Sequence, residues 1–157
     1  FTTRMSSGMP DLTGLSISDV ATATNLTLAA DTISVINYTG AAAATCTLPA
    51  ATAGTVVVYA QAVDTTGGTA TLVFDAAGSD VWATGSVIES RGSSEVTFDT
   101  SAAGETKLTF TPANATTNLL TVGGQIAFIC YETGTWHIAT SLARETTQVT
   151  GAFAFAA

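Results

Sequence analysis

Apolar and polar residues alternate with a period of two along several short stretches of this chain. Val96 and Phe98, for example, are separated by threonine and flanked by acidic residues. This spacing predicts β-strands with one buried face and one face in solvent. The stretches that share the pattern are 45–48, 69–75, 94–100 and 106–111, with Cys46, Leu48, Leu72, Phe74, Val96, Phe98, Leu108 and Phe110 as their apolar positions. The chain is therefore expected to be all-β.

Two longer stretches, 55–63 and 125–131, are apolar on both faces of an extended strand. Strands of this kind occur in the centre of a sheet or where a partner covers the outer face. Either reading applies here, and the second indicates assembly with other subunits.

Glycine-containing segments lie between the predicted strands, at 64–68, 101–105 and 132–135. Glycine adopts the positive φ that tight hairpin turns require, so we expect strands to pair mostly with their sequence neighbours. About ten short antiparallel strands at this spacing predict a single β-sandwich or jelly-roll-like barrel. We place this domain at residues 24–143, with an extended N-terminal arm at 1–23 and a C-terminal tail at 144–157.

The composition narrows the classes of function. The chain has 157 residues, of which 46% are hydrophobic and 10% charged, which favours one folded domain over disorder. Four basic residues oppose twelve acidic ones, so the net charge of −8 would repel a phosphate backbone. No apolar stretch approaches the roughly 20 residues of a membrane-spanning helix. We expect neither nucleic acid nor a membrane as a partner.

The two predicted arms carry apolar residues that would be unfavourable on a free segment. Burying one phenylalanine ring is worth roughly 1.5–3 kcal/mol, so the tail is expected to dock on something. The chain also opens on Phe1 rather than Met, which indicates a trimmed N-terminus or an incomplete sequence. The interface candidates are Phe1, Met5, Met9, Leu12, Leu15, Phe153 and Phe155.

Residues that usually carry catalysis or bind metals are scarce. His137 is the one histidine, and it is out of phase with Trp136 and Ile138, which predicts a polar outward residue rather than a catalytic imidazole. Cys46 and Cys130 are isolated, so we expect free buried thiols rather than a disulfide or a zinc site. The sequence predicts no enzyme, no metal and no cofactor.

Two other features have a plain and a functional interpretation. Asp75 and Asp80 flank a glycine and suggest calcium, but a plain turn is favoured because the spacing departs from a calcium-binding loop. Aromatic residues at strand spacing are more often core or interface residues than a sugar-stacking platform. The aromatic residues considered are Tyr59, Trp82, Tyr131 and Trp136.

Four segments in order, 25–36, 46–55, 73–82 and 134–138, resemble the β-modules of tailed-bacteriophage head decoration and fibre proteins. The similarity covers roughly residues 25–142. It implies a capsid decoration, or cement, protein on the outer capsid surface of the virion. Such a protein is often a homotrimer and clamps neighbouring subunits of the major capsid protein. The resemblance carries no catalytic residues.

The expected function is therefore a structural virion protein that stabilises a phage head from outside. The alternative is a phage fibre or adhesin domain that binds host-surface glycan through Trp82 or Trp136. A hydrolase using His137 is the weakest of the three hypotheses.

Overall fold

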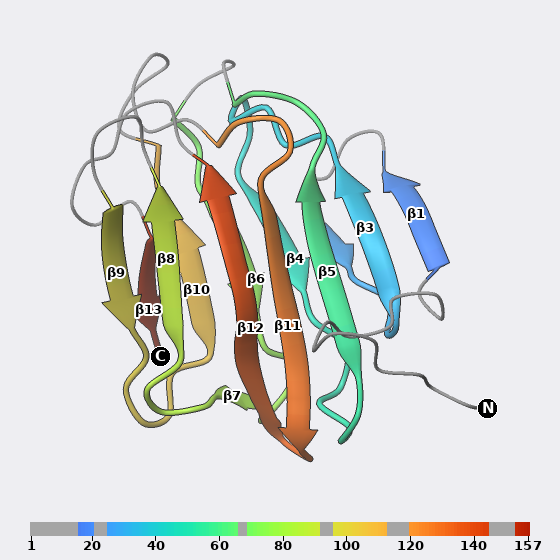
Figure 1. Ribbon diagram of the computed structural model, residues 1–157, viewed down its shortest axis with the longest axis vertical. Helices are drawn as coiled ribbons and strands as arrows, with labels where there is room; N and C mark the ends of the chain where they lie inside the picture. Colours follow the sequence, from blue (N-terminus) through green and yellow to red (C-terminus); the bar gives the residue numbers. More distant parts are fainter. Residues whose placement is uncertain (1–15, 21–24, 66–68, 92–95, 113–119, 145–152) are drawn as a thin grey trace, which may run out of the picture.

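The computed structural model describes residues 16–20, 25–65, 69–91, 96–112, 120–144 and 153–157. These residues form two β-sheets packed face to face, with no helix among them and no closed barrel (Figure 1). The all-β class and the sandwich-like architecture expected from the sequence are confirmed.

The large sheet has eight strands. Its order is β1 (Ser16–Val20), β3 (Thr32–Ile36), β5 (Val56–Gln61), β11 (Gln125–Glu132), β12 (Thr135–Arg144), β8 (Val87–Arg91) and β9 (Val96–Thr100), with the short β7 (Val81–Trp82) also paired to β12. The small sheet has five strands, in the order β13 (Phe153–Ala156), β10 (Lys107–Phe110), β6 (Leu72–Asp75), β4 (Ala44–Thr47) and β2 (Asn25–Thr27).

The first six strands do not pair with their sequence neighbours. The chain passes from one sheet to the other after each strand, so β1, β3 and β5 are parallel in the large sheet while β2, β4 and β6 are parallel in the small sheet. The expectation of a purely antiparallel fold is therefore wrong, and the sheets are mixed. Local turn chemistry does not specify which sheet receives the next strand.

Two of the predicted glycine turns illustrate the difference. Residues 132–135 form a true hairpin, because Glu132 pairs with Thr135 and Gly134 has a φ of 89°. Residues 101–105, with Gly104 at a φ of 80°, instead connect β9 of the large sheet to β10 of the small sheet. Only the first of these two turns joins paired strands.

The core lies between the sheets and is rich in aromatic rings. Phe74 of the small sheet contacts Tyr59 and Phe128 of the large sheet, with ring centroids 5.0 and 5.2 Å apart. Trp82 continues the chain of contacts to Phe128 at 5.5 Å and to Phe155 at 5.8 Å. Aromatic pairs at these separations add to the stability that burial alone provides.

A network of buried polar side chains lies in one part of this core. The Tyr59 hydroxyl donates a hydrogen bond to Gln61 Oε1, and Gln61 Nε2 donates to the carbonyl oxygens of Tyr38 and Val63. The Tyr38 hydroxyl donates to the carbonyl oxygen of Ala70. Because each side chain has a partner, the network links β5 to the loops around it without leaving a buried group unpaired.

The regions expected to be arms contribute strands to the sandwich. Residues 16–20 form β1 and pair with β3, although the sequence placed them in an arm. Residues 153–156 form β13 and pair with β10, although the sequence placed them in a free tail. The interface candidates Phe1, Met5, Met9, Leu12 and Leu15 lie outside the described residues.

Candidate interaction surface

The outward face of the large sheet is apolar along its central strands. In β3 and β5 the buried residues Ile36, Val57 and Tyr59 point into the core, so alternation turns their neighbours outward. We define the outer apolar face as these outward residues of β3, β5 and β11: Ile33, Val35, Val56, Val58, Ala127 and Ile129.

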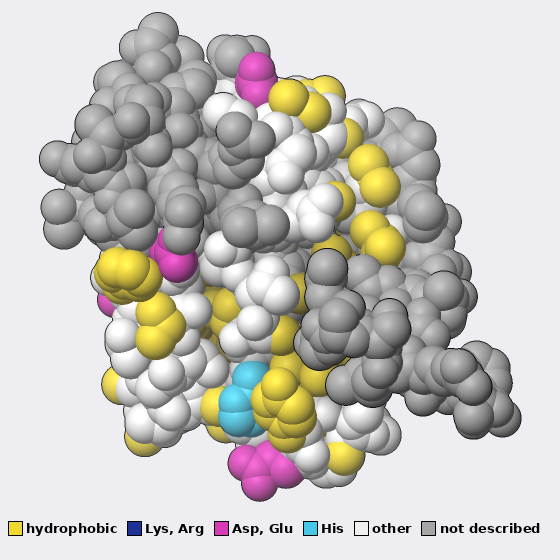
Figure 2. Space-filling model, in the orientation of Figure 1, with side chains coloured by type: hydrophobic (Ala, Val, Ile, Leu, Met, Phe, Trp, Pro, Cys, Tyr) yellow, Lys and Arg dark blue, Asp and Glu magenta, His cyan; other side chains and the backbone are white. Residues whose placement is uncertain are grey.

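The strand register places these residues in continuous rows. Ile33 pairs with Val58, and Val58 pairs with Ala127, so one row crosses three strands. A second row joins Val56 to Ile129. Figure 2 shows hydrophobic side chains over the coloured part of this face, with acidic side chains near its borders. Both apolar stretches lie in the middle of the large sheet, which is one of the two interpretations that the sequence left open.

Val58 is buried although its side chain points away from the core between the sheets. Its side chain is only 7% exposed, yet it is not part of the core cluster between the sheets. The remaining residues of the outer apolar face are half-buried. None of these six residues is among the large hydrophobic residues that are exposed in the described part of the chain, so the face is apolar but not widely exposed.

The opposite surface of the sandwich has a different character. The outward residues of the small sheet include threonine at several register positions, with Thr27 paired to Thr47 and Thr45 paired to Val73. Lys107 is exposed on the same surface. The two outer faces of the molecule are thus chemically distinct, and the apolar one belongs to the large sheet.

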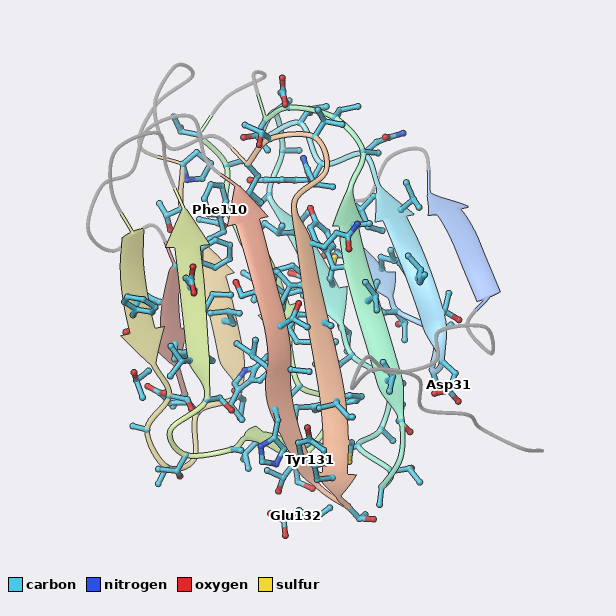
Figure 3. All side chains as sticks on the ribbon, viewed as in Figure 1. Asp31, Phe110, Tyr131 and Glu132 are labelled. Atoms are coloured by element: carbon cyan, nitrogen blue, oxygen red, sulfur yellow. The ribbon has the colours of Figure 1, made fainter. Side chains whose placement is uncertain are left out.

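Charged residues lie at the two ends of the large sheet. Asp31 and Glu132 are exposed at one end, as Figure 3 shows. Asp31 has a positive φ of 53° and is held there because its backbone and carboxylate both bond to the backbone of Val56, at 2.7 and 3.1 Å. At the other end, β12 and β8 bring Arg144 and Arg91 side by side as register partners.

An aromatic pair sits beside the acidic end. The Tyr131 ring is 66% exposed and meets the His137 ring edge to face, with centroids 4.9 Å apart. His137 pairs with Ile129 in the register, on the opposite side of the strand from the buried Trp136. The outward position predicted for His137 is confirmed. Its Nε2 atom is buried and has no hydrogen-bond partner among the described residues.

The C-terminal interface candidates lie in the core. Phe153 and Phe155 are 4% and 9% exposed, and Phe153 stacks on Phe110 with ring centroids 5.0 Å apart. The tail does dock, as expected, but on β10 of its own chain. Pairing with β10 buries both rings within the sandwich, so they are not exposed for the contacts with other subunits that the sequence suggested.

The rings expected to bind glycan in the alternative hypothesis are also buried. Trp82 and Trp136 are 1% and 0% exposed and neighbour each other in the register of β7 and β12. Neither ring presents a face on which a sugar can stack. Their indole N–H groups have no partner among the described residues. Of the four aromatic residues considered from the sequence, Tyr131 is the exposed one. The exposure of Phe98 was missed, because alternation does not tell which face of a strand lies in solvent.

Phe98 is the clearest case of this ambiguity. Its ring is 64% exposed, although the pattern of residues 94–100 predicted it inward. Phe98 and Asp99 point to opposite faces of the strand, as alternation requires, but Phe98 lies on the outer face rather than the inner one. Asp99 lies on the side toward the small sheet, where its carboxylate accepts a hydrogen bond from the backbone of Phe155.

The described residues show no group suited to hold a metal ion. No cluster of three or more His, Cys, Asp or Glu side chains occurs in the described ranges. The carboxylate of Asp80 instead accepts a hydrogen bond from the backbone N–H of Ala51 at 2.7 Å, as a side chain that fixes a loop does. This contact supports the plain-turn interpretation of residues 75–80.

Both cysteines are free and buried, as the sequence predicts. Burial raises the pKa of the Cys46 thiol to about 12 and raises the pKa of Cys130. Burial also raises the pKa of Tyr38 to about 12, and it raises that of Tyr59, to which Cys46 and Tyr38 add like-charge repulsion. All four groups are thus protonated, and the thiols are poor nucleophiles at neutral pH.

No helix within the described residues has the length and apolar character needed to cross a membrane. Comparison of the chain with protein-family models, with curated proteins and with solved structures gives no match.

Proposed function

We propose that this chain is a structural virion protein that decorates the outer capsid surface of a tailed-phage head by binding subunits of the major capsid protein. The observation that supports it is the apolar outer side of the central strands β5 and β11, a character that strands have where a partner covers the outer face of a sheet. The resemblance of residues 25–142 to decoration modules supplies the identity of the partner. A homotrimer stays a prediction from that resemblance.

A decoration protein recognises a surface that exists only after assembly, since its site spans neighbouring subunits. The chain should therefore cosediment with assembled shells of the virus that encodes it and not with unassembled capsid subunits. The variant Ile129→Glu should lose this binding, because it places a charge on the outer apolar face.

The matched control is Thr109→Glu, which introduces the same charge on the outer face of the small sheet. It should bind shells like the wild type. Equal binding to shells and to isolated subunits, or no binding to either, would overturn the proposed function.

A further inference from the structure

We propose that two copies of this chain pair edge to edge through β9, antiparallel and centred on Phe98, so that their large sheets join into one continuous sheet. The strand is not part of the outer apolar face, which β3, β5 and β11 form. The inference therefore goes beyond the proposed function and does not depend on it.

The outer backbone edge of β9 is open. The strand ends the large sheet, and among the described strands it pairs with β8 alone (Figure 1). At the end of this pairing the N–H of Ser101 donates a hydrogen bond of 2.9 Å to the carbonyl oxygen of Ser86. Opposite residues of an antiparallel ladder alternate between hydrogen-bonded and non-hydrogen-bonded pairs. The N–H and C=O groups of Phe98, and of the residues two positions before and after it, therefore point to the open edge.

The outer surface beside this edge is apolar and exposed. Phe98 is 64% exposed, and Val87 of β8 is 42% exposed. Val87 lies opposite Thr100 in the register, and the buried Ile88 next to it points into the core. Val87 and Phe98 thus lie diagonally to each other on the outer face. A strand added at this edge would remove part of both side chains from water, which favours association.

Two other edge strands of the sandwich are less suited to pairing. β2 has three residues and exposes Asn25 and Thr27. In β13 the exposed residues are alanines, and the N–H of Phe155 is bonded to Asp99. Short strands, polar side chains and occupied backbone groups keep an edge from pairing with other chains. In contrast to these two strands, β9 offers five residues, open backbone groups and an exposed ring.

A second β9 matches this edge in one register. When the pair is centred on Phe98, the two copies of Phe98 lie opposite each other and exchange both backbone hydrogen bonds. Val96 of each copy pairs in the same way with Thr100 of the second copy. All open backbone groups of both strands are then satisfied, whereas a shift of the centre by one residue leaves some of them without a partner. The two exposed rings meet on the same face, as stabilising cross-strand aromatic pairs do.

The net charge of −8 on each copy is compatible with this contact. Asp99 lies opposite residue 97 of the second copy rather than opposite another acid, and its carboxylate is bonded to Phe155 of its own chain. Glu89 lies one strand away from the joint, as the register partner of Phe98. Three strand spacings, or roughly 14 Å, separate the two copies of Glu89, which exceeds the screening length of about 8 Å at physiological salt.

The symmetry of the pair leaves the outer apolar face free. The two-fold axis that relates opposite strands of a sheet runs perpendicular to that sheet. The outer faces of both large sheets therefore lie on the same side of the pair. Such a pair offers two copies of the outer apolar face to one partner surface, which raises the avidity for that surface.

The first test is the mass of the full chain by sedimentation equilibrium, without any shell. A single strand pair is a small contact, so we expect a dissociation constant on the order of 10–100 µM. The mass should rise from one chain toward two as the concentration increases from about 10 µM to about 1 mM. Unfolding measured at lower concentrations reports on the single chain.

Three variants show whether the edge makes the contact. Thr100→Pro removes an N–H that points to the open edge and leaves the bond of Ser101 to β8 in place, so it should raise the dissociation constant about tenfold or more. Phe98→Ser should raise it several-fold. Tyr131→Ser is the matched control, because it removes a ring that is 66% exposed on β11, and it should leave the dissociation constant unchanged. Circular dichroism checks that each variant is folded.

The second test is hydrogen exchange of single amides, followed by nuclear magnetic resonance at low and high protein concentration. The amide of Phe98 should exchange several-fold more slowly at high concentration, because the pair occupies it. The amide of Asp99 points toward β8 and should exchange equally at both concentrations. This contrast identifies pairing through the edge, which packing of two faces would not produce.

A single chain at all concentrations would overturn the inference, and so would a pair that neither Thr100→Pro nor Phe98→Ser weakens. Three copies, which the resemblance to decoration modules implies, would overturn it too, because one strand edge pairs with one other. Slower exchange of Phe98 only when shells are present would show that a capsid strand occupies the edge instead. Ile129→Glu should keep the pair and lose shell binding, so the pair and the proposed function are tested separately.

Discussion

The backbone N–H of Phe155 donates a hydrogen bond of 2.8 Å to the Asp99 carboxylate. This bond links β13, at the edge of the small sheet, to β9, at the edge of the large sheet. An edge strand exposes unpaired backbone groups that invite other strands to pair with it. Asp99 satisfies one of these groups and joins the two sheets at this end of the sandwich.

Asp99→Ala is expected to lower the free energy of unfolding by about 1–3 kcal/mol, because it leaves a partly buried N–H without an acceptor. Asp99→Asn should lower it less, since the amide oxygen still accepts. Urea denaturation measures both changes. Asp64→Ala is the control, because Asp64 makes a similar bond of 2.7 Å to the N–H of Val122 at an exposed site. A loss as large for Asp64→Ala as for Asp99→Ala would contradict the role given to Asp99.

Two phenylalanines test which parts of the chain are core. Phe155→Ala removes a ring that is 9% exposed and should lower the free energy of unfolding by about 3–5 kcal/mol. Phe98→Ala removes a ring that is 64% exposed and should change it by about 0.5 kcal/mol or less. Thermal or urea unfolding distinguishes them. A larger loss of unfolding free energy for Phe98→Ala than for Phe155→Ala would mean that Phe155 lies outside the core and that Phe98 lies within it.

The apolar periodicity of the sequence predicted where the strands lie more reliably than it predicted which strands pair with each other. The inward positions Cys46, Leu72, Phe74 and Leu108 are buried as predicted, because alternation follows directly from strand geometry. The passage of the first six strands between the sheets was not predictable, since local turn chemistry does not specify which sheet receives the next strand.

The candidate surface could be predicted only in part. The apolar character of 55–63 and 125–131 on both faces predicted two of the three strands of the outer apolar face, β5 and β11, but not β3. The burial of Phe155 was missed, because a short apolar tail has the same sequence whether it pairs with its own chain or with another. The proximity of Arg91 and Arg144 depends on the parallel pairing of β8 and β12, which carries no local signal.

Gln61 is expected to be the residue on which the buried polar network depends. Gln61→Leu leaves the Tyr59 hydroxyl and two carbonyl oxygens without their partner, so the free energy of unfolding should fall by about 2–4 kcal/mol. Gln125→Leu, at an exposed position of β11, should change it by about 0.5 kcal/mol or less.

A double variant separates the network from simple packing. If the hydroxyl of Tyr59 and the amide of Gln61 act together, the loss for Tyr59→Phe with Gln61→Leu is smaller than the sum of the single losses. The losses are measured by urea denaturation of the wild type, the two single variants and the double variant. Additive losses would show that the two side chains stabilise the fold independently.

Alkaline pH should destabilise the protein through its buried thiols and phenols. The Cys46 pKa is about 12 in the folded protein, against an ordinary value of 9.0, so the unfolded chain releases its proton first. The stability linked to this group is complete below pH 9 and is lost as the pH rises from 9 to 12. Between pH 8 and pH 10 the expected loss from Cys46 is about 1.4 kcal/mol.

Cys46→Ala isolates this contribution when urea unfolding is followed at pH 8, 9 and 10 under reducing conditions. The variant should be less stable at pH 8, because the smaller side chain leaves a cavity between the sheets. Its stability should nevertheless fall less steeply with pH than that of the wild type. Tyr38, whose pKa is raised from 10.0 to about 12, continues to lower the stability of both proteins above pH 10. Equal slopes in the two proteins would show that the Cys46 thiol ionises as readily in the folded chain as in the unfolded one.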